Sequence, residues 1–300
     1  IQGKEEEEID DDDDDDDDDD EEEALISVSA SSYSKILKKC CDSLIDGRII
    51  HDHIIRHGYD KNIYVVNCLG YFYGNFGALR EAYWLFRDIF GHGRDVFSWN
   101  FLIRAYAKDG RVNDAFESFQ QMHVEDVLPD KFSFICLLSS CDYRDQGMSL
   151  HACIIEHALE TQNLIGNALI SFYGKCGRLE EARSSFGMMS TQRDIVSWNS
   201  LLAGYVEHGH TLHALEMFEE MQCRFVQPNN MLYSCILTTC TNEGAILQGR
   251  VIHAQIIRDE FESDVIIGTA IIDMYANYGS VEEARNVFHR LKDRNWKSWS

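Results

Sequence analysis

The residues of this chain that could bind a metal ion are its ten cysteines and twelve histidines. A zinc site needs closely spaced ligands such as a Cys-x-x-Cys pair, and the sequence contains none. Cys136 and Cys141, like Cys235 and Cys240, are five residues apart, which suits one face of a helix poorly, so we interpret them as small apolar packing residues. His123-Val124-Glu125 matches half of the zinc deaminase signature, but no Pro-Cys-x-x-Cys follows it. We therefore expect no metal, no cofactor and no catalytic residue in this chain.

Charge is concentrated at the amino-terminal end. Residues 5–23 hold eighteen Asp and Glu. The net charge is -24 with these residues and -6 without them. Such a run cannot bury apolar surface, so we predict a disordered acidic tail over residues 1–29. The sequence shows no signal peptide and no run of 18 apolar residues, so we expect a soluble chain with reduced cysteines and no membrane partner.

The elements that position the remaining polar residues are repeats. Val96-Phe-Ser-Trp-Asn100 and Ile195-Val-Ser-Trp-Asn199 nearly coincide at an offset of 99 residues, and the same offset links Pro129 to Pro228. Within residues 96–130, apolar side chains at i, i+3, i+4 and i+7 predict a first helix. The glycine that follows readily adopts the left-handed conformation, so it predicts a turn. A second apolar stripe after it predicts a second helix. The unit is therefore expected to be a helix–turn–helix hairpin.

This hairpin recurs in two alternating forms. The frame Asn, Tyr, Gly, Ala and Phe returns at identical spacing, with Thr269 replacing Asn in one copy. A second form places Cys, Gly and His in that frame, as at Cys240, Gly249 and His253. The expected repeats are 30–62, 63–95, 96–130, 131–162, 163–194, 195–229, 230–264 and 265–295, and a ninth begins at 296–300. One hairpin of this size cannot bury its apolar face, so the sequence predicts an all-α, right-handed α-solenoid of stacked hairpins.

The frame Val-x-Ser-Trp-Asn-x-Leu-Ile-x-x-Tyr-x-x-x-Gly-x-x-x-x-Ala-x-x-x-Phe-x-x-Met, 35 residues long, resembles the pentatricopeptide repeat. The tetratricopeptide repeat has 34 residues and a different signature. The rotation of long and short variants resembles the plant PLS-type subclass of the family. The resemblance covers roughly nine-tenths of the chain, as the repeat boundaries define it.

The resemblance implies sequence-specific binding of single-stranded RNA, with one base addressed by each repeat. In such proteins the fifth and last residues of a repeat select the base: Asn with Asp selects uracil, Asn with Asn a pyrimidine, and Thr with Asn adenine. Carried over, the pairs for uracil are Asn67 with Asp95, Asn100 with Asp130, and Asn167 with Asp194; the pyrimidine pair is Asn199 with Asn229, and the adenine pair is Thr269 with Asn295.

The long variants stay undecoded, with the pairs Ser34/Asn62, Ile135/Gln162 and Ser234/Asp264. Family members align their N-terminal repeat with the 5′ base, so the expected target is 5′-UUNUYNA-3′. The second residue of a repeat is implied to wedge between adjacent bases, as Tyr64, Phe97, Leu164, Val196 and Ile266.

Each assignment has a structural alternative. A fifth-position Asn could be a surface polar residue, a closing Asp could cap the next helix, and Tyr64 or Phe97 could belong to the core. His151 and His253 fit core or partner-facing positions better than metal ligation. The net charge of -6 outside residues 5–23 also keeps open a protein-binding scaffold without RNA readout. A groove of Asn and Asp with Lys or Arg nearby would favour RNA, and an apolar or acidic groove a protein partner.

The resemblance further implies an adaptor role in organellar RNA processing, above all in C-to-U editing. Its partners would be organellar editing factors or a deaminase supplied in trans, in the mitochondrion or plastid. No DNA partner is expected. The sequence starts at Ile1 and stops inside a pattern at Ser300, so a catalytic domain after Ser300 stays open.

Overall fold

The computed structural model describes residues 30–39, 43–88, 93–141, 144–189, 193–242 and 245–291. The expected acidic tail and the start of a ninth repeat lie outside these residues. Throughout the described part every regular element is a helix, which confirms the all-α class. No helix among these residues is long and apolar enough to span a membrane. The contacts divide the chain into two units, residues 1–109 and 110–300.

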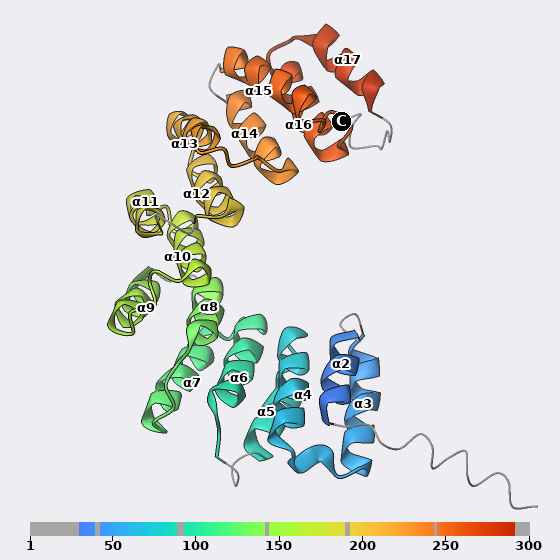
Figure 1. Cartoon of the computed structure of the whole chain (residues 1–300), viewed down its shortest axis with the longest axis vertical. Coiled ribbons are helices and arrows are strands. Elements are labelled where there is room, and N and C mark those ends of the chain that lie inside the picture. Colours follow the sequence, from blue (N-terminus) through green and yellow to red (C-terminus); the bar gives the residue numbers. More distant parts are fainter. Residues whose placement is uncertain are drawn as a thin grey trace, which may run out of the picture. The chain divides into compact units, whose positions relative to one another are not determined.

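The first unit contains two helix pairs and the first helix of a third. Its elements are α2 (Ala30–Lys39), α3 (Leu44–Arg56), the 3-10 turn η1 (Tyr59–Lys61), α4 (Ile63–Asn75), α5 (Leu79–Asp88) and α6 (Val96–Lys108). Helix α4 is central, because it packs against α2, α5 and α6 (Figure 1). First helices therefore pack on first helices, with α5 against both α4 and α6.

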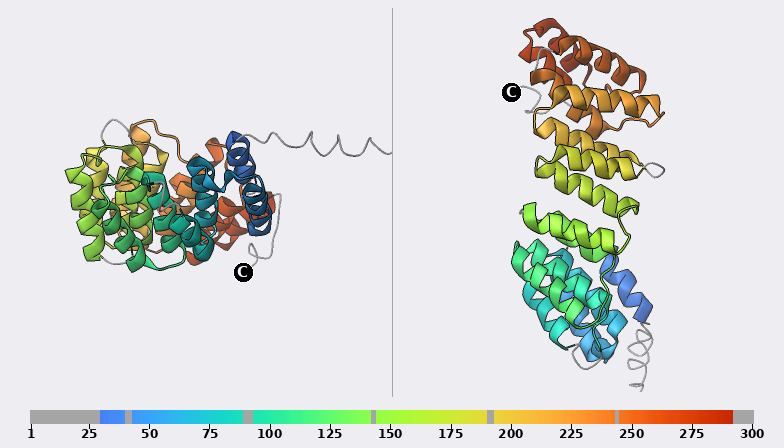
Figure 2. Two further views of the ribbon diagram at one scale, coloured as in Figure 1. Left: turned by 90° about the horizontal axis from the view of Figure 1, so that it is seen from below. Right: turned by 90° about the vertical axis from the view of Figure 1, so that its left-hand side faces the viewer.

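The second unit continues this sequential packing. Its elements are α7 (Val112–Val124), α8 (Lys131–Ser140), α9 (Arg144–Glu156), α10 (Asn163–Lys175), α11 (Leu179–Met188), α12 (Ile195–Glu207), α13 (Thr211–Cys223), α14 (Asn230–Asn242), α15 (Ile246–Arg258), α16 (Val265–Asn277) and α17 (Val281–Arg290). Helices α8, α10, α12, α14 and α16 each pack on the next in this series. The second helices α11, α13 and α15 each pack on the first helices before and after them (Figure 2).

The residues that repeat along the sequence form the core of each unit. The frame alanines Ala82, Ala115, Ala182 and Ala214 are completely buried, so neighbouring helices approach closely at these points. The frame tyrosines Tyr73, Tyr173, Tyr205 and Tyr275 are at most 5% exposed. The glycine that ends the first helix, for example Gly110 with φ 78°, has the left-handed conformation that the turn requires.

The long variants achieve close packing differently. Where the frame alanine is replaced by Gly47, Gly147 or Gly249, a side chain of the next hairpin occupies the space that a Cβ atom would need. At Gly147 an added Cβ would lie 1.9 Å from Cζ of Phe172. The long variants therefore use a large residue on the following first helix as the packing group, and the glycine receives it.

The recurring histidines of the long variants contact the tyrosine of the following hairpin. The His Nδ1 to Tyr Oη distance is 3.0 Å for His51–Tyr73, 2.6 Å for His151–Tyr173 and 3.0 Å for His253–Tyr275. Burial lowers the pKa of all three histidines below the usual value, so they are neutral near pH 7. These side chains therefore join consecutive hairpins. Within the described ranges, no three His, Cys, Asp or Glu side chains come together in a way that could hold a metal ion.

Candidate nucleic-acid interface

In the first unit the fifth residue of one hairpin is joined to the last residue. Asn67 Nδ2 donates to both carboxylate oxygens of Asp95, at 3.1 and 3.2 Å. The Ser98 hydroxyl donates to Asn67 Oδ1 at 3.0 Å, and its oxygen is 2.8 Å from Asp95 Oδ1. Asp95 also accepts the backbone N–H of Ser98 at 2.8 Å, as the N-cap of α6. Since Asn67 is only 7% exposed, these bonds fix the plane of its amide.

The second unit repeats this arrangement at Asn167. Its Nδ2 lies 3.3 and 3.5 Å from the two carboxylate oxygens of Asp194, and Ser197 Oγ donates to Asn167 Oδ1 at 2.7 Å. Burial alone would raise the pKa of Asp194, but hydrogen bonds from the Ser197 backbone and hydroxyl and from Asn167 together lower it. Asp194 is therefore an ionised acceptor that holds the asparagine amide.

The closing residues also have the structural role that the sequence left open. Each of these last residues accepts a backbone N–H at the start of the next first helix: Asn62, Asp95, Asp130, Asp194, Asn229 and Asp264. Helix capping by the closing residue is thus present alongside any contact to a ligand. In contrast, the surface alternative for the asparagines is wrong at Asn67 and Asn100, which are 7% and 1% exposed.

The other expected pairs are less complete. Asn100 lies in the first unit, whereas its expected partner Asp130 caps α8 in the second. Asn199 is half-buried, and its Oδ1 is buried without a hydrogen-bond partner in the described part of the chain. Thr269 donates its hydroxyl to Val265 O at 2.7 Å, and its partner Asn295 lies outside the described residues.

The expected base-wedging residues are exposed apolar side chains. Tyr64, Phe97, Leu164, Val196 and Ile266 are between 50% and 61% exposed, so the core alternative for Tyr64 and Phe97 is wrong. Phe132 and Met231 hold the same second position in long variants and are also exposed, at 43% and 68%. Our interpretation of the sequence omitted these two, although the repeat register alone would have found them.

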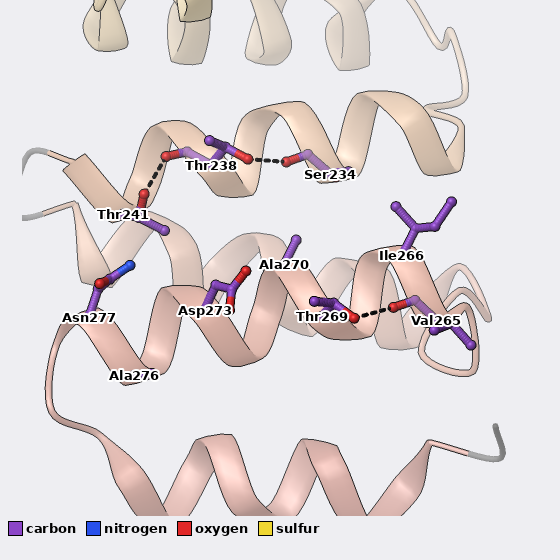
Figure 3. A pocket seen from close by; sticks show the side chains of 10 residues that line it. All are labelled: Ser234, Thr238, Thr241, Val265, Ile266, Thr269, Ala270, Asp273, Ala276 and Asn277. Atoms are coloured by element: carbon purple, nitrogen blue, oxygen red, sulfur yellow. Dashed lines mark hydrogen bonds between the residues drawn. The ribbon is translucent and has the colours of Figure 1, made fainter. Parts of the chain in front are cut away.

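Two cavities bring the expected residues together. The first, which we name the Tyr64 groove, has a volume of about 650 Å³ and is lined by Ser34, Lys38, Tyr64, Asn67, Tyr71, Asp95 and Phe97, among others. The second, which we name the Thr269 groove, has a volume of about 730 Å³ and is lined by Ser234, Thr238, Thr241, Ile266, Thr269, Asp273 and Asn277, among others (Figure 3). The first groove lies between α2 and α4 and the second between α14 and α16, so each follows a long variant in the same register.

The ninth residue of a repeat carries a cation in two repeats of the first unit and a carboxylate near the end of the second. It is Lys38, Tyr71 and Arg104 in the three repeats that begin in the first unit, and Thr238 and Asp273 in the last two repeats. The thirteenth residue shows no such gradient, because it is Asp42, Asn75 and Lys108 in the first three repeats and Lys175 and Glu207 in later ones. Lys38 and Asp273 are exposed, whereas Arg104 is half-buried and donates to Asn75 Oδ1. The Tyr64 groove therefore combines Asn and Asp with a nearby cation, whereas the Thr269 groove carries a carboxylate.

Comparison with known protein families gives matches to the PPR repeat family over residues 94–141 and 193–242 and to the PPR repeat over residues 167–193 and 269–296. A pentatricopeptide repeat-containing protein of Arabidopsis thaliana is 32% identical over 275 residues, which cover 90% of this chain and 48% of the relative. A mitochondrial relative of the same plant is 31% identical, over 89% of this chain and 43% of its own length. The relative CRR2, chloroplastic, also of Arabidopsis thaliana, is 29% identical, over 87% and 41%.

The chain thus spans less than half the length of these curated relatives. Among solved structures it is similar to the pentatricopeptide repeat protein PPR10 from maize, with a TM-score of 0.55 and 19% identity over 90% of this chain and 45% of the other. A second structure of PPR10, in complex with an 18-nt psaJ RNA element, matches with the same TM-score and 17% identity. At these identities the likeness shows the fold, and no catalytic domain is indicated within this chain.

Proposed function

Because the chain belongs to the pentatricopeptide repeat family, we propose that it binds single-stranded RNA sequence-specifically, one base per repeat. The proposal includes the plant PLS-type subclass and the eight repeats from residue 30 to residue 295. The fifth and last residues select the bases as the family resemblance implies, so the proposed target is 5′-UUNUYNA-3′. Phe132 and Met231 join the five base-wedging residues.

The observation that carries this proposal is the state of the Asn67 amide in the Tyr64 groove. An asparagine amide has two N–H donors and two acceptor lone pairs. One N–H is shared between the two carboxylate oxygens of Asp95, and Ser98 takes one lone pair, which leaves one donor and one acceptor for a ligand. Uracil offers an N3–H donor next to a carbonyl acceptor, so its edge complements what remains. Asp95 acts through Asn67 by holding the amide in plane.

Stacking supplies the remaining contacts. Tyr64 and Phe97, both 51% exposed, line the same groove as Asn67. A base held at Asn67 would place its faces against these rings, and such stacking contributes about 1–3 kcal/mol per base. Lys38 at the edge of the groove supplies a cation for the phosphate backbone.

We extend the proposal to the cellular role. The chain acts as the RNA-specificity part of an adaptor in C-to-U editing, with organellar editing factors or a deaminase supplied in trans. Its relatives include mitochondrial and chloroplastic proteins, which supports the mitochondrion or plastid as its location. The bound nucleic acid is RNA rather than DNA.

The competing function is a protein-binding helical-repeat scaffold. The observation that favours it is the charge, which is -24 for the chain and -6 without residues 5–23. Acidic proteins repel the phosphate backbone over long range. The two functions differ in whether an isolated RNA of the correct sequence binds at low salt.

The test is a binding titration of the whole chain with a fluorescent RNA that contains UUAUCGA, against the same bases scrambled. We expect tight binding to the first RNA alone. Tyr64→Ala should weaken binding by roughly tenfold, because it removes a stacking ring. Tyr83→Ala is the matched control, since Tyr83 is 47% exposed on the second helix α5 and does not line the groove.

A second variant tests the base assignment. Asp95→Asn preserves a side-chain acceptor for the α6 cap, and the family pattern assigns Asn with Asn to either pyrimidine. We expect this variant to accept cytosine as well as uracil at the first base of the target. Equal binding of matched and scrambled RNA, or no binding at low salt, would favour the scaffold. Retained preference for uracil in Asp95→Asn would contradict the base assignment alone.

A further inference from the structure

The Thr269 groove and the Tyr64 groove differ at the ninth residue of both repeats that form them. In the Tyr64 groove these residues are Lys38 on α2 and Tyr71 on α4. In the Thr269 groove they are Thr238 on α14 and Asp273 on α16. Asp273 follows Thr269 by four residues, so both side chains lie on the same face of α16. Figure 3 shows Asp273 and Ile266 directed from α16 towards α14.

The threonine hydroxyl groups in the Thr269 groove use their protons within their own helices. Thr269 donates to Val265 O at 2.7 Å, and Thr238 donates to Ser234 O at 2.9 Å. Towards a bound molecule these two oxygens can therefore only accept hydrogen bonds. Asp273 is exposed to solvent, and its carboxylate has no hydrogen bond or ion pair within the part of the chain that the structure describes. Its oxygens are also acceptors.

This set of groups favours a ligand that brings donors. Asn277 and the Ser234 hydroxyl are the lining side chains that can themselves donate, and no lining residue is a cation. Adenine and cytosine present an exocyclic amino group, and guanine presents an amino group beside a ring N–H. Uracil presents carbonyl oxygens on both sides of its single ring N–H, and a carboxylate repels these oxygens.

We propose that Asp273 is a further specificity-determining residue, which accepts a hydrogen bond from the exocyclic amino group of the base held at Thr269 and rejects uracil there. The inference rests on the proposed RNA-binding function and adds a contact outside the fifth and last residues of the repeat. Ile266, which is 61% exposed and lines the same groove, supplies an apolar surface against the face of that base. Asp273 thus selects a chemical class of base where Thr269 alone offers only an acceptor oxygen.

The experiment measures Kd of the whole chain for four RNAs, UUAUCGA, UUAUCGC, UUAUCGG and UUAUCGU, which differ only in the last base. For the unsubstituted protein we expect the three RNAs with an amino-bearing last base to bind about tenfold more tightly than the one ending in uracil, because a hydrogen bond to a charged group is lost. In Asp273→Asn the amide can donate to a carbonyl, so the uracil RNA should gain affinity and the preference for cytosine and guanine over uracil should disappear.

Glu282→Gln is the matched control, because it removes the same charge from the exposed surface of the second helix α17. It should leave the ranking of the four RNAs unchanged. An unchanged ranking in Asp273→Asn would overturn the inference and leave the proposed function standing. Equal, measurable affinity of the unsubstituted protein for all four RNAs would overturn the inference together with the adenine assignment of the Thr269 pair, and would leave RNA binding itself standing. Absence of binding to every RNA would overturn both the inference and the proposed function. An equal gain for all four RNAs in both variants would reduce Asp273 to a general charge effect and would also overturn the inference.

Discussion

The Tyr64 groove and the Thr269 groove occupy the same place in the repeat frame, each between a long-variant first helix and the first helix that follows. The Tyr64 groove has aromatic walls, a lysine and a hydrogen-bonded Asn–Asp pair. The Thr269 groove has aliphatic and hydroxyl side chains and an unpaired carboxylate in the described part of the chain. The backbone frame therefore fixes where a groove forms, while a few positions inside that frame determine what each groove can bind.

The largest expected difference concerns the closing residues of the repeats beside the two grooves. Asp95→Ala removes the α6 cap and leaves the buried Asn67 amide without its acceptor, so we expect a loss of about 2–4 kcal/mol in unfolding free energy. Asp264→Ala removes the α16 cap, but its other partner, Asn230, is half-exposed and can bond water. We expect about 1 kcal/mol there.

Urea unfolding followed by circular dichroism measures both losses. Equal losses for the two variants would show that the Asn67–Asp95–Ser98 network contributes nothing beyond the cap. The two grooves would then differ only in the side chains that line them.

A second difference concerns the packing of the glycine in each of the two long variants that border the grooves. Gly47 receives the ring of Phe72, where an added Cβ would lie 2.0 Å from Cε1, and Gly249 receives Met274, at 2.2 Å from Sδ. A rigid ring cannot yield as a methionine can. Gly47→Ala should cost about 1–3 kcal/mol, and Gly249→Ala less than about 1 kcal/mol. Thermal unfolding of both variants checks this, and a larger loss for Gly249→Ala would contradict it.

A third difference is the charge at the ninth repeat position. Lys38→Thr should lower RNA affinity by roughly two- to fivefold, and Thr238→Lys should raise it by a similar factor. The slope of log Kd against log salt should change by about 0.7 in each case, in opposite directions, because one phosphate contact is lost or gained. Titrations at several salt concentrations measure both quantities. Unchanged slopes would show that neither position lies near the backbone of the RNA.

The smallest expected difference involves the histidines of the same long variants. Burial lowers the pKa of His51 and of His253, so each contributes stability that is present above about pH 6.5 and lost as the pH falls towards the folded-state pKa. Two carboxylates, Asp52 and Glu81, oppose this shift at His51. At His253 one carboxylate, Glu262, opposes it and Arg290 reinforces it, so the net opposition is weaker there. The drop in Tm between pH 7.5 and pH 5.5 should therefore shrink more in His253→Gln than in His51→Gln. The reverse order would contradict this assignment of neighbouring charges.

The sequence by itself determined the fold class and the positions of the candidate interface. Spacing was sufficient for this, because a helical hairpin that recurs at a fixed period must bury the same positions in every copy. Tyr73, Ala115 and Gly110 behave as their places in the frame require. The exposed second residues, including the omitted Phe132 and Met231, follow from the same register.

Only the tertiary structure decided which of these side chains meet. Periodicity does not reveal that the Asn67 amide is held by both Asp95 and Ser98, since these residues are 28 and 31 positions apart in the chain. Nor does it reveal that two threonines of the Thr269 groove direct their protons into their own helices and present only acceptor oxygens to the groove. Hydrogen-bond direction depends on local atomic distances, whereas a repeat pattern records only which face of a helix a residue occupies.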